Sequence, residues 1–240
     1  MKPIFKRVML KISGEGLAGA KKTGFDAEVI AKLALQIDEL HQSGVQVCIV
    51  VGGGNFFRGA KSGGMDRSVA DQIGMLATVM NAMALKSALE GLLTPVKVFS
   101  GINVPQVCDY YTFREASKAL SENNVVIFAG GTGSPYFTTD TGAALRAIEM
   151  HCDILMKATQ VDGVYDNDPR FNKQAKRYDE ITFAEVLEKH LNVLDMTAVT
   201  MAQEANLPVM IFALNAEKSI VNAVCGKEKS TIIKKERGVK

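Results

Sequence analysis

The sequence predicts an α/β fold in which helices cover both faces of a mainly parallel sheet, a three-layer αβα arrangement. Short runs of β-branched residues alternate along the chain with longer segments whose apolar residues recur at helical spacing. A strand–helix–strand order favours parallel pairing with right-handed crossovers. Because no low-complexity tract, internal repeat or Pro/Ser-rich linker interrupts the alternation, we expect residues 1–240 to form one domain.

Seven strands and four helices are expected from these patterns. The strands cover residues 8–12, 45–51, 96–99, 125–129, 154–157, 208–212 and 231–234. The helices cover residues 27–43, 69–90, 141–150 and 195–206. Asp26 is placed to cap the first helix and Gly44 to end it.

The second expected helix carries two apolar stripes. We expect the first stripe to pack on the sheet and the second to form a twofold contact with another subunit, since a helix that is apolar over so much of its surface must be covered on more than one side. The first stripe is Val69, Ile73, Leu76, Met80 and Met83, and the second is Met75, Val79 and Ala82.

Composition and charge exclude several classes of protein. The chain has 28 Lys and Arg against 26 Asp and Glu, a formal net charge of +2, which lacks the basic excess of a dedicated nucleic-acid binder. No apolar run approaches the roughly 18 residues of a membrane span, and residues 1–7 lack a signal-peptide core. Four widely spaced cysteines, Cys48, Cys108, Cys152 and Cys225, are expected to be buried reduced thiols. We therefore expect a cytoplasmic protein that binds neither nucleic acid nor membrane.

Glycine-rich segments follow three of the expected strands, at residues 11–16, 52–59 and 130–140. In a parallel sheet the carboxyl ends of the strands meet at one edge, where ligands bind. Glycine lets a ligand approach the backbone closely, and successive amide N–H groups can bind an anion. Three such segments at one edge predict a site for a polyphosphate or for two phosphorylated ligands.

Two familiar phosphate-binding motifs do not explain these segments. Residues 14–19 match G-x-G-x-x-G, but residues 20–24 are expected to continue as a loop, and the second strand ends in glycines rather than an acidic residue. A Walker loop, G-x-x-x-x-G-K-[ST], is absent from the sequence. Any nucleotide must therefore be held by a different arrangement.

Several polar side chains near these segments are candidates for binding. Lys11 and Arg58 could contact phosphate, although the first could equally be a strand-end lysine and the second an exposed arginine. Asp71 could accept ribose hydroxyls or simply be a favourable acid in the first turn of a helix. After the fifth strand, Tyr165 could stack on a base and Asp168 could bind sugar hydroxyls.

Taken together, the motifs resemble those of the bacterial uridylate kinases (UMP kinases), a family with the amino-acid-kinase fold. The matching segments are residues 11–15, 52–59, 74–81, 132–140 and 157–168. They occur in order over the whole length, and the 74–81 and 132–140 runs are specific to this family rather than to the fold. The resemblance implies transfer of the γ-phosphate of ATP to UMP, with Mg²⁺, by a homohexamer built from dimers.

The resemblance also implies site residues. Those for ATP are Lys11, Ile12, Ser13, Gly14, Gly54 and Arg58 at the phosphates, and Thr159, Gln160, Tyr165 and Asp168 at adenosine. Those for UMP are Gly53, Asp71, Thr132, Gly133, Ser134, Pro135, Tyr136, Phe137, Thr138 and Thr139. Lys11, Arg58 and Asp140 are the implied catalytic residues, with Asp195 as an implied Mg²⁺ ligand and Lys157 as a further charge. Asp140 could instead be a helix N-cap.

An effector-linked segment is implied as well, at Gly19, Ala20, Lys21, Lys22, Thr23 and Gly24. The chain departs from the family at the GTP-activation site, where it has Lys86, Ser87 and Asn124. Two alternatives remain at this stage: an amino-acid or carbamate kinase on the same fold, and a nucleotide sensor without activity. The kinases of the first group would lack the 132–139 and 55–58 runs.

Overall fold

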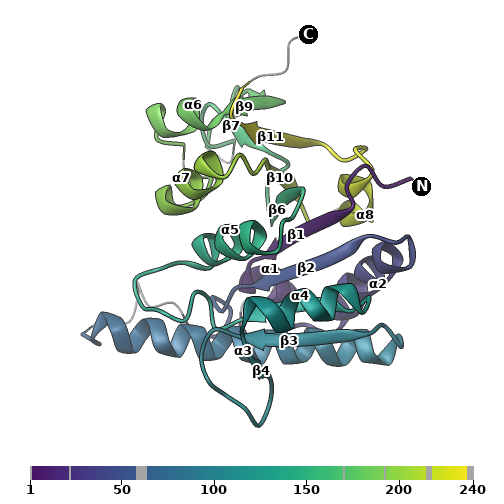
Figure 1. The fold of residues 1–240 in the computed structure, drawn as a ribbon. Coiled ribbons are helices and arrows are strands. Elements are labelled where there is room, and N and C mark those ends of the chain that lie inside the picture. Colours follow the sequence, from purple (N-terminus) through teal and green to yellow (C-terminus); the bar gives the residue numbers. More distant parts are fainter. Residues whose placement is uncertain are drawn as a thin grey trace.

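The computed structural model describes residues 2–21, 23–57, 64–169, 171–191, 193–214 and 218–236. A nine-stranded sheet runs through this part of the chain in the order β4-β3-β5-β2-β1-β6-β10-β11-β9 (Figure 1). Its strands are β1 (Arg7–Ile12), β2 (Gln46–Val51), β3 (Val96–Ser100), β4 (Asp109–Tyr110), β5 (Val125–Ala129), β6 (Ile154–Thr159), β9 (Glu180–Thr182), β10 (Val209–Ala213) and β11 (Ser230–Lys234). The pairs are parallel except for β10 with β11, so the predicted mainly parallel sheet is confirmed. Because one sheet connects both halves of the sequence, we propose that the chain is one domain.

Helices cover both faces of this sheet. One face packs against α1 (Gly14–Ala18), α2 (Ala27–Gln42), α3 (Arg67–Gly91) and α8 (Ser219–Val224). The other packs against α4 (Phe113–Ser121), α5 (Thr139–Glu149), α6 (Phe183–Glu188) and α7 (Met196–Glu204). Successive side chains of a strand alternate between these two layers: Val8 and Leu10 of β1 lie in the first core, and Met9 lies in the second.

The helix ends follow from local side-chain chemistry. Asp26 caps α2, as predicted, by accepting from the backbone N–H of Glu28 at 2.9 Å. Gly44 follows the helix with a positive φ of 85°, a conformation that glycine adopts without strain. The predicted helices are confirmed as α2, α3, α5 and α7.

The structure adds elements that the periodicity did not show. The segment after β1, expected to be a loop, begins with α1, because Ser13 accepts from the backbone N–H of Gly16 and so caps a short helix. A 3₁₀ turn over Gly19–Lys21 follows. The helices α4, α6 and α8 and a small hairpin of β7 (Val164–Tyr165) and β8 (Arg177–Tyr178) were also missed. The elements α6, α8, β7 and β8 are too short for their apolar spacing to stand out, whereas α4, which has nine residues like α7, was simply not recognised.

The two stripes of α3 are interchanged relative to the prediction. Met75, Val79 and Ala82 are buried, whereas Leu76, Met80 and Met83 are 40–49% exposed. The buried face also carries Thr78 and Asn81. Small and polar side chains on this face let the helix approach the glycine-rich ends of the strands closely, which larger residues would prevent. The Met75, Val79 and Ala82 stripe therefore does not serve as an intersubunit contact.

Gly53, just after β2, shows how close this approach is. A Cβ atom there would lie 2.6 Å from the carbonyl oxygen of Gly74 and 2.9 Å from Cβ of Ala77, both on α3. We expect Gly53→Ala to lower the free energy of unfolding by roughly 1–3 kcal/mol, because the helix must move away. Gly74→Ala is a matched control, since its Cβ would meet nothing within 4 Å, and it should stabilise α3 by about 0.5–1 kcal/mol. Urea denaturation measures both changes, and a Gly53→Ala protein as stable as the parent would contradict this packing argument.

Candidate active site

The predicted glycine-rich segments meet at the carboxyl ends of β1, β2 and β5. β1 lies between β2 and β6, and β5 lies on the far side of β2, so the segments that follow these strands are neighbours in space. Lys11 on β1 is in register with Lys157 on β6. The site thus starts from two lysines side by side on adjacent strands.

Asp140 lies between the two lysines. Lys11 Nζ is 2.7 Å from one carboxylate oxygen, Oδ1, and Lys157 Nζ donates to the other, Oδ2, at 2.6 Å. The Lys11 contact lacks hydrogen-bond alignment, so its attraction is mainly between charges. Lys157 also donates to the backbone carbonyl of Val193 at 2.6 Å. Asp140 therefore holds two ammonium groups close together at the end of the central strands.

The charges in this cluster shift one another's pKa values. Burial acts to raise the pKa of Asp140, but the nearby Lys11 and Lys157 outweigh it, so the net pKa is lowered and the carboxylate stays ionised. Burial lowers the pKa of Lys157, and Lys11 adds to that effect, while Asp140 partly opposes it. Asp195 also favours the charged form of Lys157, so the two lysines share the influence of two carboxylates. The two ammonium groups can turn towards an anionic ligand.

The start of α5 places Asp140. Thr138, rather than Asp140, is the N-cap of α5, since its hydroxyl accepts from the backbone N–H groups of Asp140 and Thr141. Asp195 fixes this cap from α7 by accepting from the hydroxyls of Thr138 and Thr141. The alternative that Asp140 itself is a helix cap is therefore wrong.

Asp195 itself has little capacity left for a metal ion. It caps α7 by accepting from the backbone N–H of Ala198 at 3.0 Å, in addition to the two threonine hydroxyls. Within the described ranges, no three His, Cys, Asp or Glu side chains are grouped so that they could hold a metal ion. The protein side chains described thus do not fit a pre-built Mg²⁺ site, and the structure gives Asp195 the role of a support for α5.

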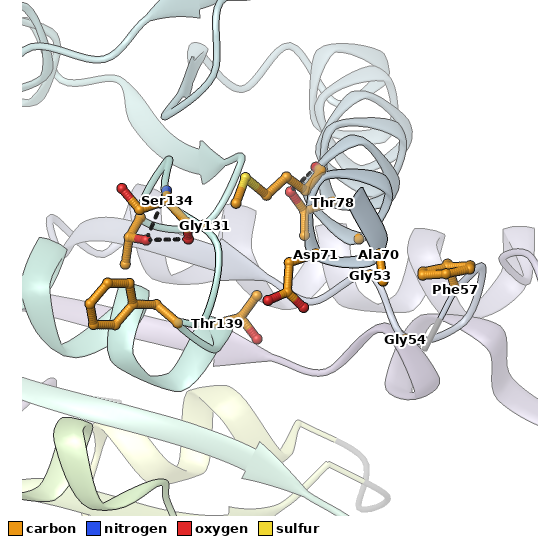
Figure 2. A pocket seen from close by; sticks show the side chains of 13 residues that line it. Gly53, Gly54, Phe57, Ala70, Asp71, Thr78, Gly131, Ser134 and Thr139 are labelled. Atoms are coloured by element: carbon orange, nitrogen blue, oxygen red, sulfur yellow. Dashed lines mark hydrogen bonds between the residues drawn. The ribbon is translucent and has the colours of Figure 1, made fainter. Parts of the chain in front are cut away.

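A pocket lies between α3 and the segment after β5 (Figure 2). Thr139, in its lining, immediately precedes Asp140 of the cluster. It brings together six of the residues predicted for UMP: Gly53, Asp71, Thr132, Ser134, Phe137 and Thr139. Gly133, Pro135, Tyr136 and Thr138 belong to the same segment but do not line the pocket. The pocket has seven further lining residues that were not predicted for UMP: Gly54, Phe57, Ala70, Gly74, Met75, Thr78 and Gly131. Gly54, Phe57 and Gly131 lie in the glycine-rich segments that predicted the site, whereas the small or apolar type of the α3 residues gave no indication of their place.

Asp71 extends across this pocket. Its Oδ2 atom accepts from the backbone N–H of Tyr136 and from Nε of Arg67, each at 2.8 Å. Tyr136 has a positive φ of 71°, an uncommon conformation for an aromatic residue, and its ring lies 5.5 Å from the Arg67 guanidinium. These contacts connect the two walls of the pocket and hold the segment after β5 in a strained turn.

Backbone amides on both walls are available to an anion. In the part of the chain that the structure describes, no acceptor receives the N–H of Gly53, Gly54 or Gly131. Gly131 has a positive φ of 57°, and a side chain there would meet open space. Such unpaired N–H groups beside Lys11 and Lys157 suit phosphate oxygens.

The residues predicted for adenosine lie at the end of β6 and in the segment that follows it. Thr159 closes a turn by accepting from the backbone N–H of Val161. The Tyr165 hydroxyl, on β7, donates to Asp162 at 2.6 Å, and this bond raises the pKa of Tyr165, with a smaller contribution from burial.

Some residues that were predicted for the site are buried or contact another segment, and two lie outside the residues described. Arg58 and Lys22 lie outside the described residues. Ile12 is fully buried, and its carbonyl accepts from the backbone N–H of Gly52 at 2.8 Å. Gly24, in the segment predicted to be linked to an effector, donates its N–H to the carbonyl of Asn55 at 3.1 Å. That segment is therefore tied to the one that follows β2.

Two further expectations concern the rest of the chain. The four cysteines are free, but only Cys48 and Cys152 are buried, so the expectation of four buried thiols is half correct. No helix among the residues described is both long and apolar enough to span a membrane.

Comparison with known proteins adds to this geometry. The amino acid kinase family model matches residues 6–213. The uridylate kinase of Hyphomonas neptunium is 47% identical over 234 residues, which cover 97% of this chain and 93% of that protein. The crystal structure of UMP kinase from Ureaplasma parvum superposes with a TM-score of 0.92 at 39% identity, covering 96% of this chain and 99% of that one. The UMP kinase of Bacillus anthracis superposes with a TM-score of 0.93 at 35% identity, covering 98% of both chains.

Proposed function

Since this chain belongs to the uridylate kinases of the amino acid kinase family, we propose that it transfers the γ-phosphate of ATP to UMP, giving ADP and UDP. The resemblance inferred from the motifs is thereby confirmed at the level of the family. The relatives favour this function over an amino-acid or carbamate kinase on the same fold, and over a sensor without activity.

The observation that carries the proposal is the position of the Lys11–Asp140–Lys157 cluster beside the pocket of Asp71. A kinase has to bring two anions together and neutralise charge on the group that moves. The cluster supplies two ammonium groups, at 2.7 and 2.6 Å from one carboxylate. The pocket, which is lined by Gly53, Gly131 and the Thr139 that precedes Asp140, supplies unpaired amides. Two lysines held by one carboxylate at the carboxyl ends of neighbouring strands are what a phosphoryl-transfer site requires.

In the proposed reaction, a phosphate oxygen of UMP attacks the γ-phosphorus of ATP. The bond from this phosphorus to the oxygen that bridges it to the β-phosphate breaks, and ADP leaves with the electron pair. The attacking oxygen is already ionised near neutral pH, so no general base is required. Because the transition state is loose in most analyses, the protein contributes mainly alignment and charge neutralisation.

Each part of the site has a proposed role in this scheme. Lys11 and Lys157 contact the transferring phosphoryl group, while Asp140 keeps the two lysines at a fixed spacing. Arg58 supports the phosphates as well, by the family resemblance. The ATP residues are Lys11, Ile12, Ser13, Gly14, Gly54, Thr159, Gln160, Tyr165 and Asp168. The UMP residues are Gly53, Asp71 and the segment 132–139, with Asp71 accepting from the ribose.

Mg²⁺ is expected as part of the ATP substrate. Because the oxygens of Asp195 accept from threonine hydroxyls and a backbone N–H, we do not assign it as a ligand. Mg²⁺ commonly keeps several waters and binds phosphate oxygens with few protein ligands. When bound there, it would neutralise part of the phosphate charge.

Turnover with UMP against acetylglutamate tests the function directly. ADP release with UMP and none with acetylglutamate is the expected result. Turnover of acetylglutamate alone would establish the rival kinase, and binding of ATP with no turnover of either acceptor would indicate a sensor.

We further propose a homodimer that associates through α3 and, by the family resemblance, assembles further into a hexamer. The face of α3 that points away from the sheet carries Val69, Leu76, Met80 and Met83, each 40–49% exposed. Four such side chains on one helix face exceed the scattered apolar residues of an ordinary surface. A twofold contact would cover each stripe with its copy. Effector regulation through 19–24 and a cytoplasmic location are proposed on the resemblance alone.

The substitution Met80→Glu is expected to dissociate the particle, because it places a charge in the proposed contact. Sedimentation should show a smaller species, while circular dichroism should remain that of a folded protein. Lys86→Glu is a control on α3, where the native side chain is paired with Glu90 at 3.4 Å rather than apolar. A monomeric parent, or unchanged assembly of Met80→Glu, would exclude this contact.

A further inference from the structure

We propose that Asn81 and Asn55 are positioning residues that fix the glycine-rich segments of the site. This inference rests on the proposed function, because it concerns how these segments present their amides to phosphate. Asn81 lies on the buried face of α3, and Asn55 lies in the segment after β2. They are 0% and 2% exposed, so this is a fully buried pair of amide side chains.

The two amides form a closed set of hydrogen bonds. Asn55 Nδ2 donates to Asn81 Oδ1 at 2.9 Å, and Asn81 Nδ2 donates to Asn55 Oδ1 at 2.7 Å. The second hydrogen of each Nδ2 group goes to the backbone: Asn81 donates to the carbonyl of Gly52 at 2.7 Å, and Asn55 donates to the carbonyl of Gly24 at 2.7 Å. Every N–H of the pair is thus used, which is required of buried amides.

The bond to Gly52 determines where the next amide points. A peptide unit is planar, so the carbonyl of Gly52 and the N–H of Gly53 point in opposite directions when the bond is trans. The described chain has no cis peptide bond. By holding the carbonyl towards α3, Asn81 directs the Gly53 N–H away from the helix, and Gly53 lines the pocket. Asn81 therefore orients a phosphate-binding donor that it does not itself touch.

Asn55 fixes two more segments, the one that contains Gly24 and the one that begins after β1. It is joined to Gly24 in both directions, through its side chain to the carbonyl and through its own carbonyl to the N–H. A side chain at Gly14 would overlap Asn55 Oδ1 and would lie 2.7 Å from the backbone N of Gly54. The pair thus sets the spacing between the ends of β1 and β2.

Thr78, one turn before Asn81 on α3, holds the segment after β5 in place. Its hydroxyl accepts from the backbone N–H of Gly130 at 2.7 Å and donates to the carbonyl of Met75 at 2.6 Å. The buried face of α3 consequently fixes both walls of the pocket. Apolar side chains in place of Asn81 and Asn55 would avoid the cost of removing two amide groups from water. They would, however, leave the carbonyls of Gly52 and Gly24 without these donors.

The variant that tests this inference is Asn81→Leu, which keeps a similar volume and removes both donors. Thr94→Val is the matched control. Thr94 is 2% exposed and donates to Asp38 at 2.6 Å, so its loss also removes a buried hydrogen bond, but between α2 and the segment after α3, away from the site. Both variants should lower the free energy of unfolding, and Asn81→Leu should lower it by more, because it removes three side-chain hydrogen bonds where Thr94→Val removes one. Two site readouts are compared with that loss: kcat/KM for UMP, and the Kd of inorganic tripolyphosphate from calorimetry.

We expect Asn81→Leu to lower kcat/KM by at least about tenfold, mostly through kcat, and to raise the tripolyphosphate Kd by about tenfold, because small misplacements are costly in phosphoryl transfer. Thr94→Val should leave both within about twofold. A folded Asn81→Leu protein with both values near the parent's would overturn the inference, as would an equal loss in Thr94→Val. If Asn81→Leu does not fold, Asn81→Ser is measured by the same criteria.

The two proposals fail in different ways in this experiment. If the parent protein does not phosphorylate UMP, the proposed function is wrong, and the ratio of tripolyphosphate affinities alone decides the role of Asn81. If the parent binds no tripolyphosphate, the segments are not an anion site and the inference is wrong even where UMP is turned over.

Discussion

Replacing Lys11 by alanine is expected to lower kcat/KM for UMP by roughly 10²-fold or more, with the protein still folded. The ammonium group acts mostly where charge moves in the transition state, so the loss should appear largely in kcat. Folding should be retained, because Asp140 keeps its 2.6 Å contact with Lys157. Removing the neighbouring charge of Lys11 should also raise the pKa of Lys157, since Lys11 contributes to lowering it.

Two comparisons distinguish lost catalysis from lost structure. Lys118→Ala removes an exposed lysine, paired at 3.9 Å with Glu122, and should be silent in both activity and stability. Lys11→Arg keeps the positive charge but changes the shape of the charged group, so its kcat/KM should lie between those of the parent and of Lys11→Ala. Steady-state kinetics and thermal denaturation measure the three variants together. Near-normal turnover by a folded Lys11→Ala protein would exclude Lys11 from the chemistry.

UMP is expected to be preferred over CMP by roughly 10²-fold or more in kcat/KM, because a site built around one hydrogen-bond pattern leaves buried groups unpaired with the other. Uracil has a ring N–H donor where cytosine has an acceptor. The segment 132–139 can tell them apart through rigid backbone groups. Its turn is fixed by the bond from the Tyr136 N–H to Asp71 and by the contact between the Thr132 hydroxyl and the Ser134 carbonyl at 3.2 Å.

The comparison requires both acceptors at equal ATP concentration, with ADP release followed continuously. The difference should reside in the base, so dUMP and dCMP should show the same ratio as UMP and CMP. Comparable kcat/KM values for UMP and CMP would show that this segment does not select the base.

The central strands and the long helices could be predicted from the sequence. The order of these elements along the chain was enough to predict the layered parallel sheet. In long elements the spacing of apolar residues shows which side chains will be buried. Glycine-rich segments at three strand ends were enough to predict that these segments meet at one edge, since the carboxyl ends of parallel strands coincide. That this edge binds phosphate stays a prediction. Lys11 and Asp140 were identified through the family motifs, whereas spacing alone left Lys11 ambiguous.

The pairing of Lys11 with Lys157 across adjacent strands could not be predicted from their positions, 146 residues apart by number. It depends on β6 lying next to β1, which the register of the folded sheet establishes. The same holds for Asp195, whose oxygens are occupied by the hydroxyls of Thr138 and Thr141. The presence of an aspartate in the sequence does not show which hydrogen-bond donors will contact its carboxylate in the fold.

What the sequence by itself determined is the layer architecture and the edge of the sheet that carries the site, because both follow from local periodicity and from the conformational freedom of glycine. Only the tertiary structure decided which face of α3 is buried. Both stripes fit a helix equally well, and the choice depends on Thr78 and Asn81 reaching the backbone of Gly130 and Gly52. Buried polar groups must find partners, and those partners come from strands far away in the chain, so their positions exist only once the sheet has formed.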